Sequence, residues 1–167
     1  MTNAQSMSRR MMLGFLGGST VAACTVGVQG STFATNGSWE TRASQLEEAS
    51  GTPYSAANEG KWTGKSGSHV AKVVDNGDGT VTASCTHPVV DADTSMTPPV
   101  GQHLITTMYA RDVETNNVLH LVEFVTRGPS RATVATMTFP IPQGVTSIKV
   151  YTYCNEHDLW VTDAIDV

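Results

Sequence analysis

Short β-type runs dominate the chain from His69 to its C-terminus. Each run is alternating or rich in β-branched residues and is bounded by turn residues, a pattern typical of strands. The expected strands are residues 71–74, 80–85, 103–112, 118–126, 132–139, 147–153 and 160–165. About seven short strands with almost no helix predict an all-β fold, an antiparallel β-sandwich.

The N-terminus has the features of an export signal. Arg9 and Arg10 form a twin-arginine motif that precedes a short apolar run. This run is too short to span a membrane as a mature helix, so residues 1–23 are predicted to be a signal peptide outside the fold. The alternative interpretation is a basic amphipathic start of a cytosolic protein.

Cys24 ends a lipobox-like sequence, Val-Ala-Ala-Cys. Small residues before the cysteine suit signal-peptidase cleavage, after which Cys24 would carry a lipid. Each buried methylene contributes about 0.8 kcal/mol, so a diacylated cysteine would hold the protein on the membrane. We therefore expect attachment to the outer side of the cytoplasmic membrane, in the cell envelope. An ordinary signal peptide with an incidental cysteine is the alternative.

Two further regions follow the predicted signal. Residues 24–59 are rich in Ser, Thr, Gly, Ala and Asn and lack strong periodicity, which predicts a flexible tether with one short helix near 39–49. Residues 60–167 contain the β-type runs and are long enough for one domain.

Cys154 and His157 could bind one metal ion from a single tight turn, because they are three residues apart. The other candidate ligands are His69, His87 and His103. Thiolate and imidazole ligands suit zinc, copper or iron. Structural zinc usually takes four ligands in total, so a fifth protein ligand disfavours tetrahedral zinc.

Three segments resemble one family, the superoxide reductases, which include neelaredoxin and the iron domain of desulfoferrodoxin. Residues 154–160, Cys-Asn-Glu-His-Asp-Leu-Trp, resemble the family's C-terminal Cys-Asn-x-His-Gly-Leu-Trp signature. Residues 61–70 resemble its Trp-x-Gly stretch leading into Lys-His-Val-Pro. Residues 87–103 resemble its His-Pro-Met-Thr-Pro-x-His segment, lengthened here by insertions. The resemblance covers residues 60–167 in the family's order.

The resemblance implies an immunoglobulin-like sandwich or barrel with one non-haem iron per chain. The implied iron ligands are four equatorial imidazoles and one axial thiolate: His69, His87, His103, His157 and Cys154. The family's ferrous centre reduces superoxide to hydrogen peroxide at an open coordination position. We therefore expect an oxidoreductase, an exported and membrane-tethered one-iron superoxide reductase that protects against oxidative stress.

The chain departs from the family pattern at three positions. Ser68 replaces a lysine that attracts superoxide, and Gly67 replaces a glutamate that can occupy the open position in the ferric state. Lys65, four residues before His69, is the candidate catalytic residue to replace that lysine. Asp158 replaces the signature's glycine, and aspartate tolerates left-handed backbone geometry better than most residues.

The charge balance constrains the partners. Loss of residues 1–23 would remove Arg9 and Arg10, leaving 8 basic and 15 acidic residues, a net charge of about −7. This charge argues against a nucleic-acid partner. It also means that any attraction of superoxide must be local. The candidate lysines, each of which could equally be an ordinary solvated side chain, are Lys65, Lys72 and Lys149.

An electron donor must come from elsewhere, because the chain has no Cys-x-x-Cys pair and hence no rubredoxin-like domain. We expect a rubredoxin-like protein or a small reductant, although the usual family donor is cytoplasmic. Homo-oligomers are common in the family, and the insertion between His87 and His103 could alter that surface.

Two other functions fit the same residues. The iron centre could belong to an electron-transfer or sensing module without reductase turnover. Alternatively, the chain could be a metal-free immunoglobulin-like structural lipoprotein with a Cys85–Cys154 disulfide, since exported proteins can form disulfides. His120 matches no family ligand and is predicted to be a sheet residue, and Trp160 is predicted to lie in the core.

Overall fold

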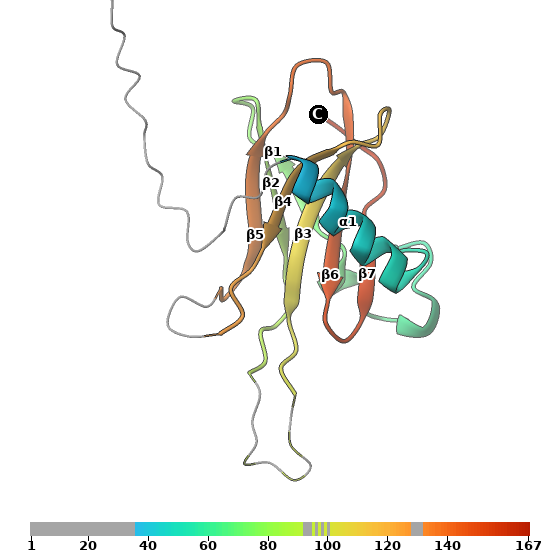
Figure 1. The fold of residues 1–167 in the computed structure, drawn as a ribbon, viewed down its shortest axis with the longest axis vertical. Helices are drawn as coiled ribbons and strands as arrows, with labels where there is room; N and C mark the ends of the chain where they lie inside the picture. Colours follow the sequence, from blue (N-terminus) through green and yellow to red (C-terminus); the bar gives the residue numbers. More distant parts are fainter. Residues whose placement is uncertain (1–35, 92–94, 96, 98, 100, 128–131) are drawn as a thin grey trace, which may run out of the picture.

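The computed structural model describes residues 36–91, 95, 97, 99, 101–127 and 132–167. These residues form mainly β-structure, with two helices and one 3₁₀ turn (Figure 1). In chain order the elements are α1 (Asn36–Ser50), η1 (Gly60–Trp62), α2 (Ser66–His69), β1 (Lys72–Asp75), β2 (Thr80–Cys85), β3 (Ile105–Asp112), β4 (Val118–Glu123), β5 (Ala135–Pro140), β6 (Ser147–Cys154), β7 (Asp158–Val161) and β8 (Ile165–Asp166). The predicted all-β class is confirmed.

Two antiparallel sheets face each other. One has the order β1-β2-β5; the other has the order β4-β3-β6-β7, with β8 pairing with β6. Alternate residues of β2 and β6 are buried, as expected of strands with one face against a core. Met108, Phe139 and Val150 are among the side chains that fill the space between the sheets. Burial of these apolar surfaces is the main force that holds the sandwich together.

The last predicted strand, residues 160–165, is interrupted. β7 begins earlier, at Asp158, and ends at Val161, and β8 starts at Ile165. Between them, Thr162 Oγ1 accepts the backbone N–H of Val150 at 3.1 Å. In an uninterrupted strand a backbone carbonyl would accept this N–H, and here a side-chain oxygen accepts it instead.

Helix α1 packs on the outer face of the larger sheet (Figure 1). Ala43 and Leu46 are buried there in a cluster with Tyr109 and Leu159. The helix contacts β4 and β7, so it lies beside the strand that follows the β6–β7 turn.

A buried arginine side chain on β3 also binds α1. Arg111, whose side chain is 5% exposed, donates through Nε to Glu47 at 2.9 Å and through one terminal nitrogen to Glu40 at 3.1 Å. Tyr109 Oη donates to the same Glu47 carboxylate at 2.9 Å. Removing either carboxylate would leave the buried Arg111 guanidinium with too few hydrogen-bond acceptors, and this would lower the stability of the fold.

The helix differs from the predicted tether over residues 24–59. The short helix expected near 39–49 is present, but it packs against the sheet instead of lying in a flexible segment. The polar composition of this segment gave no clear sign of an apolar helix face, because that face consists of only Trp39, Ala43 and Leu46. The predicted signal 1–23, Cys24 and residues 25–35 lie outside the described residues, so their assignments stay predictions.

No helix among the described residues has the length and apolarity needed to cross a membrane.

Candidate metal centre

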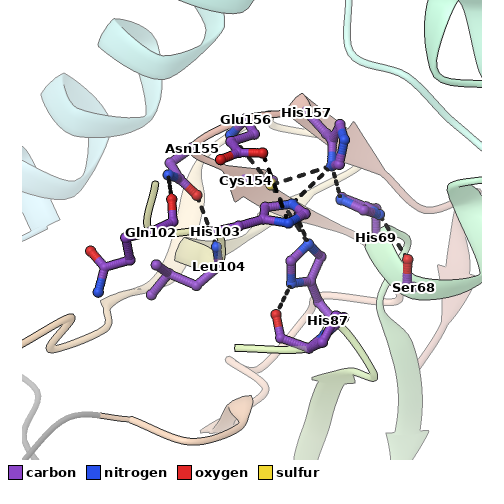
Figure 2. A network of polar contacts seen from close by, with 11 residues as sticks. Ser68, His69, His87, Gln102, His103, Leu104, Cys154, Asn155, Glu156 and His157 are labelled. Atoms are coloured by element: carbon purple, nitrogen blue, oxygen red, sulfur yellow. Dashed lines mark hydrogen bonds and ion pairs between the residues drawn. The ribbon is translucent and has the colours of Figure 1, made fainter. Parts of the chain in front are cut away.

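The five predicted ligands meet at the end of the sandwich where β6 turns into β7 (Figure 2). Their ligand atoms all lie within 4.8 Å of one another. His69 ends α2, His87 follows β2, His103 precedes β3, Cys154 ends β6, and His157 lies in the β6–β7 turn. The fold therefore brings together residues up to 88 positions apart. His120, on β4, lies outside this group.

Four imidazole nitrogens surround the centre, and three of the distances between neighbouring nitrogens are nearly equal. His157 Nδ1 is 2.9 Å from His69 Nε2 and 3.0 Å from His103 Nε2, and His103 Nε2 is 3.0 Å from His87 Nε2. Metal–imidazole bonds of about 2.1 Å at right angles would place neighbouring nitrogens about 3 Å apart. The spacing therefore fits four equatorial donors around one ion.

The imidazole rings stand nearly perpendicular to their neighbours. The planes of His69 and His87 cross at 90°, those of His87 and His103 at 87°, and those of His103 and His157 at 75°. The rings therefore pack edge to face around the centre, with their centroids 4.4–4.6 Å apart.

The Cys154 sulfur is the fifth donor. Its Sγ lies 3.7 Å from both His87 Nε2 and His157 Nδ1. These two nitrogens are opposite each other in the set, because each neighbours His103 Nε2. An atom equally distant from two opposite corners of a square fits a position above or below its centre. Five donors in all exceed the four of a tetrahedral set.

The surroundings of the Cys154 thiol favour its protonated form. Cys154 is fully buried, and burial raises the pKa of its thiol. The backbone N–H of Glu156 opposes this shift by donating to Sγ at 3.5 Å. A bound cation would favour the thiolate, since metal binding displaces the proton of a coordinating thiol.

Backbone carbonyls determine which nitrogens of two histidines are free. His69 Nδ1 lies 2.9 Å from the carbonyl of Lys65, and His87 Nδ1 lies 2.6 Å from that of Pro88. A carbonyl only accepts, so each Nδ1 carries the proton and each Nε2 presents a lone pair to the centre. Burial lowers the pKa of both His69 and His87 to about 4, so both rings are neutral at pH 7.

Helix α2 is tied to both sheets at its last residue. The carbonyl of His69 accepts the thiol of Cys85, on β2, at 3.2 Å and the hydroxyl of Thr152, on β6. Cys85 and Cys154 are both free thiols, so the alternative disulfide is not formed. Cys85 instead helps to position the first histidine.

Asn155 holds the segment that carries His103, despite the insertions before it (Figure 2). Its Oδ1 accepts the N–H of Leu104 at 2.9 Å, and its Nδ2 donates to the carbonyl of Gln102 at 2.5 Å. Val90 and His103 also exchange two backbone hydrogen bonds of 2.9 Å. Sequence reasoning did not assign Asn155 this role, although an asparagine directly after the cysteine was the available signal.

The core assignment of Trp160 is confirmed. Its side chain is fully buried, and its indole N–H donates to the carbonyl of His157 at 2.8 Å. Its ring also lies 5.2 Å from that of His69. Trp160 therefore links the core to two of the five candidate ligands.

Lys65 lies at the start of α2 and its side chain is exposed. Its carbonyl accepts a hydrogen bond from His69 Nδ1. Burial is the main cause that lowers the pKa of His87 and of His157, neighbouring histidines come next, and the charge of Lys65 is a smaller cause. The structure also places the carboxylate of Glu156 3.9 Å from His103 Nδ1.

No family model matches the chain, and no curated protein matches it. Part of the chain is similar to several solved structures. The superoxide reductase (1Fe-SOR) from Giardia intestinalis is 17% identical, with a TM-score of 0.42; the match covers 60% of this chain and 98% of that one. The superoxide reductase (neelaredoxin) from Ignicoccus hospitalis is 15% identical, with a TM-score of 0.44 and coverage of 74% and 95%. The superoxide reductase from Treponema pallidum is 17% identical, with a TM-score of 0.40 and coverage of 58% and 67%.

Proposed function

We propose that the five-residue cluster holds one non-haem iron and that the protein reduces superoxide to hydrogen peroxide. The observation that carries this proposal is the donor geometry. Three neighbouring pairs among the four nitrogens are 2.9–3.0 Å apart, and one sulfur is equidistant from two opposite nitrogens. Five donors exceed the set that structural zinc takes, and thiolate with imidazole suits iron. A ferrous ion bound there would supply one electron to superoxide, which needs two protons to become hydrogen peroxide.

The residues around the cluster leave one side more accessible to a small anion. His69 and Cys154 are almost completely buried, whereas the side chain of His103 is 20% exposed and His157 is half-buried. The sulfur side is closed, so superoxide would approach past the exposed edges of His103 and His157. The carboxylate of Glu156, 3.9 Å from His103 Nδ1, is the acidic group beside that approach.

Metal content, visible spectrum and superoxide kinetics of the full chain test this function. We expect one iron per chain and a thiolate-to-ferric band in the oxidised protein. We also expect superoxide consumption approaching the diffusional ceiling of about 10⁸ M⁻¹ s⁻¹, with one hydrogen peroxide formed per superoxide. Zinc alone or no metal would contradict the proposal. Iron that reacts slowly with superoxide would favour the electron-transfer or sensing module.

Lys65 is proposed to attract superoxide in place of the lysine that Ser68 replaces. We expect Lys65→Ala to lower the second-order rate constant by about 3- to 10-fold at low salt, because local positive charge raises the rate of encounter with an anion. The difference should shrink as ionic strength rises, because salt screens exposed charges. Rapid-mixing or pulse-radiolysis kinetics across a salt series would measure both effects.

Lys149→Ala is the matched control for Lys65. Lys149 lies on β6 five residues from Cys154, roughly 17 Å along an extended strand. Its replacement removes the same charge from the protein but should leave the rate constant within about twofold of the wild type. Equal effects of the two variants would mean that only net charge matters and would contradict a role for Lys65.

Location and partners are proposed from the sequence. The twin-arginine motif supports export of the folded protein, and the lipobox supports attachment to the membrane through Cys24. The electron donor is proposed to be a separate rubredoxin-like protein or a small reductant. Assembly into a homo-oligomer is also a proposal.

A further inference from the structure

Asp158 adopts a backbone conformation that glycine would adopt more easily. It directly follows His157, begins β7 and has a φ of 62°. Left-handed geometry is unfavourable for residues with a Cβ, although aspartate tolerates it better than most. The turn itself therefore gives no reason for a side chain at this position.

The Asp158 carboxylate joins two side chains from η1. Its Oδ2 accepts the indole N–H of Trp62 at 3.1 Å and pairs with Lys61 Nζ at 2.9 Å. Lys61 Nζ also lies 4.7 Å from the centre of the Trp62 ring. Because the Lys61 side chain is 61% exposed, its ion pair alone contributes little stability. The hydrogen bond that orients the indole is the more specific contact.

Trp62 in turn packs edge-on against His157. Their ring centres are 4.6 Å apart, and their planes cross at 76°. Carbonyls hold the outer nitrogens of His69 and His87, but none of the hydrogen bonds between described residues involves His157 Nε2. Packing against Trp62 therefore restricts the orientation of the His157 ring, as the carbonyl hydrogen bonds restrict the rings of His69 and His87.

We propose that Asp158 is a positioning residue for His157, acting through Trp62. By accepting the indole N–H, its carboxylate holds the Trp62 ring against the imidazole, so that His157 Nδ1 points to the other donors. This inference rests on the proposed metal centre. It explains why a charged side chain occupies a position where the backbone favours glycine.

Cobalt(II) is a suitable probe because its absorption bands report ligand geometry without any enzymatic turnover. We would titrate the metal-free full chain with Co²⁺ under anaerobic conditions. Removing an outer contact to a metal-binding histidine typically lowers metal affinity 10- to 100-fold. We therefore expect Asp158→Ala to bind Co²⁺ at least about 10-fold more weakly and to shift the cobalt d–d bands.

Two further variants at this position separate positioning from folding. Asp158→Gly should weaken Co²⁺ binding as Asp158→Ala does, while leaving the thermal midpoint of the metal-free protein unchanged or higher, because glycine relieves the positive φ. Asp158→Asn keeps an oxygen that can accept from Trp62 and should largely restore the wild-type spectrum. Asp163→Asn, which removes an exposed carboxylate from the same C-terminal segment, should behave as wild type.

Wild-type affinity and spectrum in Asp158→Gly would overturn the positioning role while leaving the metal centre intact. Trp62→Phe provides an independent measurement, because it keeps a ring beside His157 but removes the indole N–H; it too should shift the d–d bands. If the wild-type chain showed no thiolate-to-cobalt band, both the metal centre and this inference would fail.

Discussion

Replacing Cys154 with serine is expected to abolish the thiolate-to-ferric charge-transfer band and to lower the superoxide rate constant by roughly 100-fold or more. Loss of an outer contact typically costs 10- to 100-fold, and this change removes a donor itself. A serine hydroxyl is a harder ligand that keeps its proton at neutral pH, so it replaces neither the charge nor the softness of sulfur. Absorption spectra of the oxidised proteins and superoxide kinetics measure the two effects.

Cys85→Ser is the matched control, because Cys85 is also a buried thiol near the cluster. Its Sγ donates to the carbonyl of His69, and a serine hydroxyl can make the same kind of hydrogen bond. We expect this variant to keep the band and a rate constant near that of the wild type. A band that survives in Cys154→Ser, or disappears only in Cys85→Ser, would show that the sulfur ligand has been misassigned.

Trp160→Ala is expected to lower the free energy of unfolding of the metal-free protein by about 3–5 kcal/mol. The indole is fully buried, so its removal leaves a cavity, and the carbonyl of His157 loses its 2.8 Å hydrogen bond. Urea unfolding in the presence of a chelator measures this change. The chelator is needed because bound metal stabilises the native state and would mask the effect.

Trp160→Phe separates the cavity from the hydrogen bond. It keeps an aromatic ring in the core but cannot donate to His157, so we expect a loss of about 1–2 kcal/mol. Its metal affinity should also fall, because the turn that carries His157 is held less firmly. A loss below about 1 kcal/mol in Trp160→Ala would contradict the central position of this residue in the core.

The strands were predictable because their signal is local. Alternation in residues 80–85 and 147–153 matches the buried and exposed faces of β2 and β6. The break at Thr162 was not predictable, because it depends on a side chain between β7 and β8 meeting the Val150 amide of β6. The docking of α1 was also missed, because an apolar face as small as Trp39, Ala43 and Leu46 is significant only once the sheet it covers is known.

The sequence by itself determined the strand pattern and the donor set. The resemblance of residues 61–70, 87–103 and 154–160 to the superoxide reductase motifs identified the candidate ligands, which are His69, His87, His103, Cys154 and His157. Only the tertiary structure decided how the donors face one another. The spacing of the four nitrogens, the opposite pair beside the sulfur and the contact from Asp158 through Trp62 to His157 all join residues far apart in the chain. Such contacts are set by the packing of two sheets and a turn, and no local run of residues encodes them.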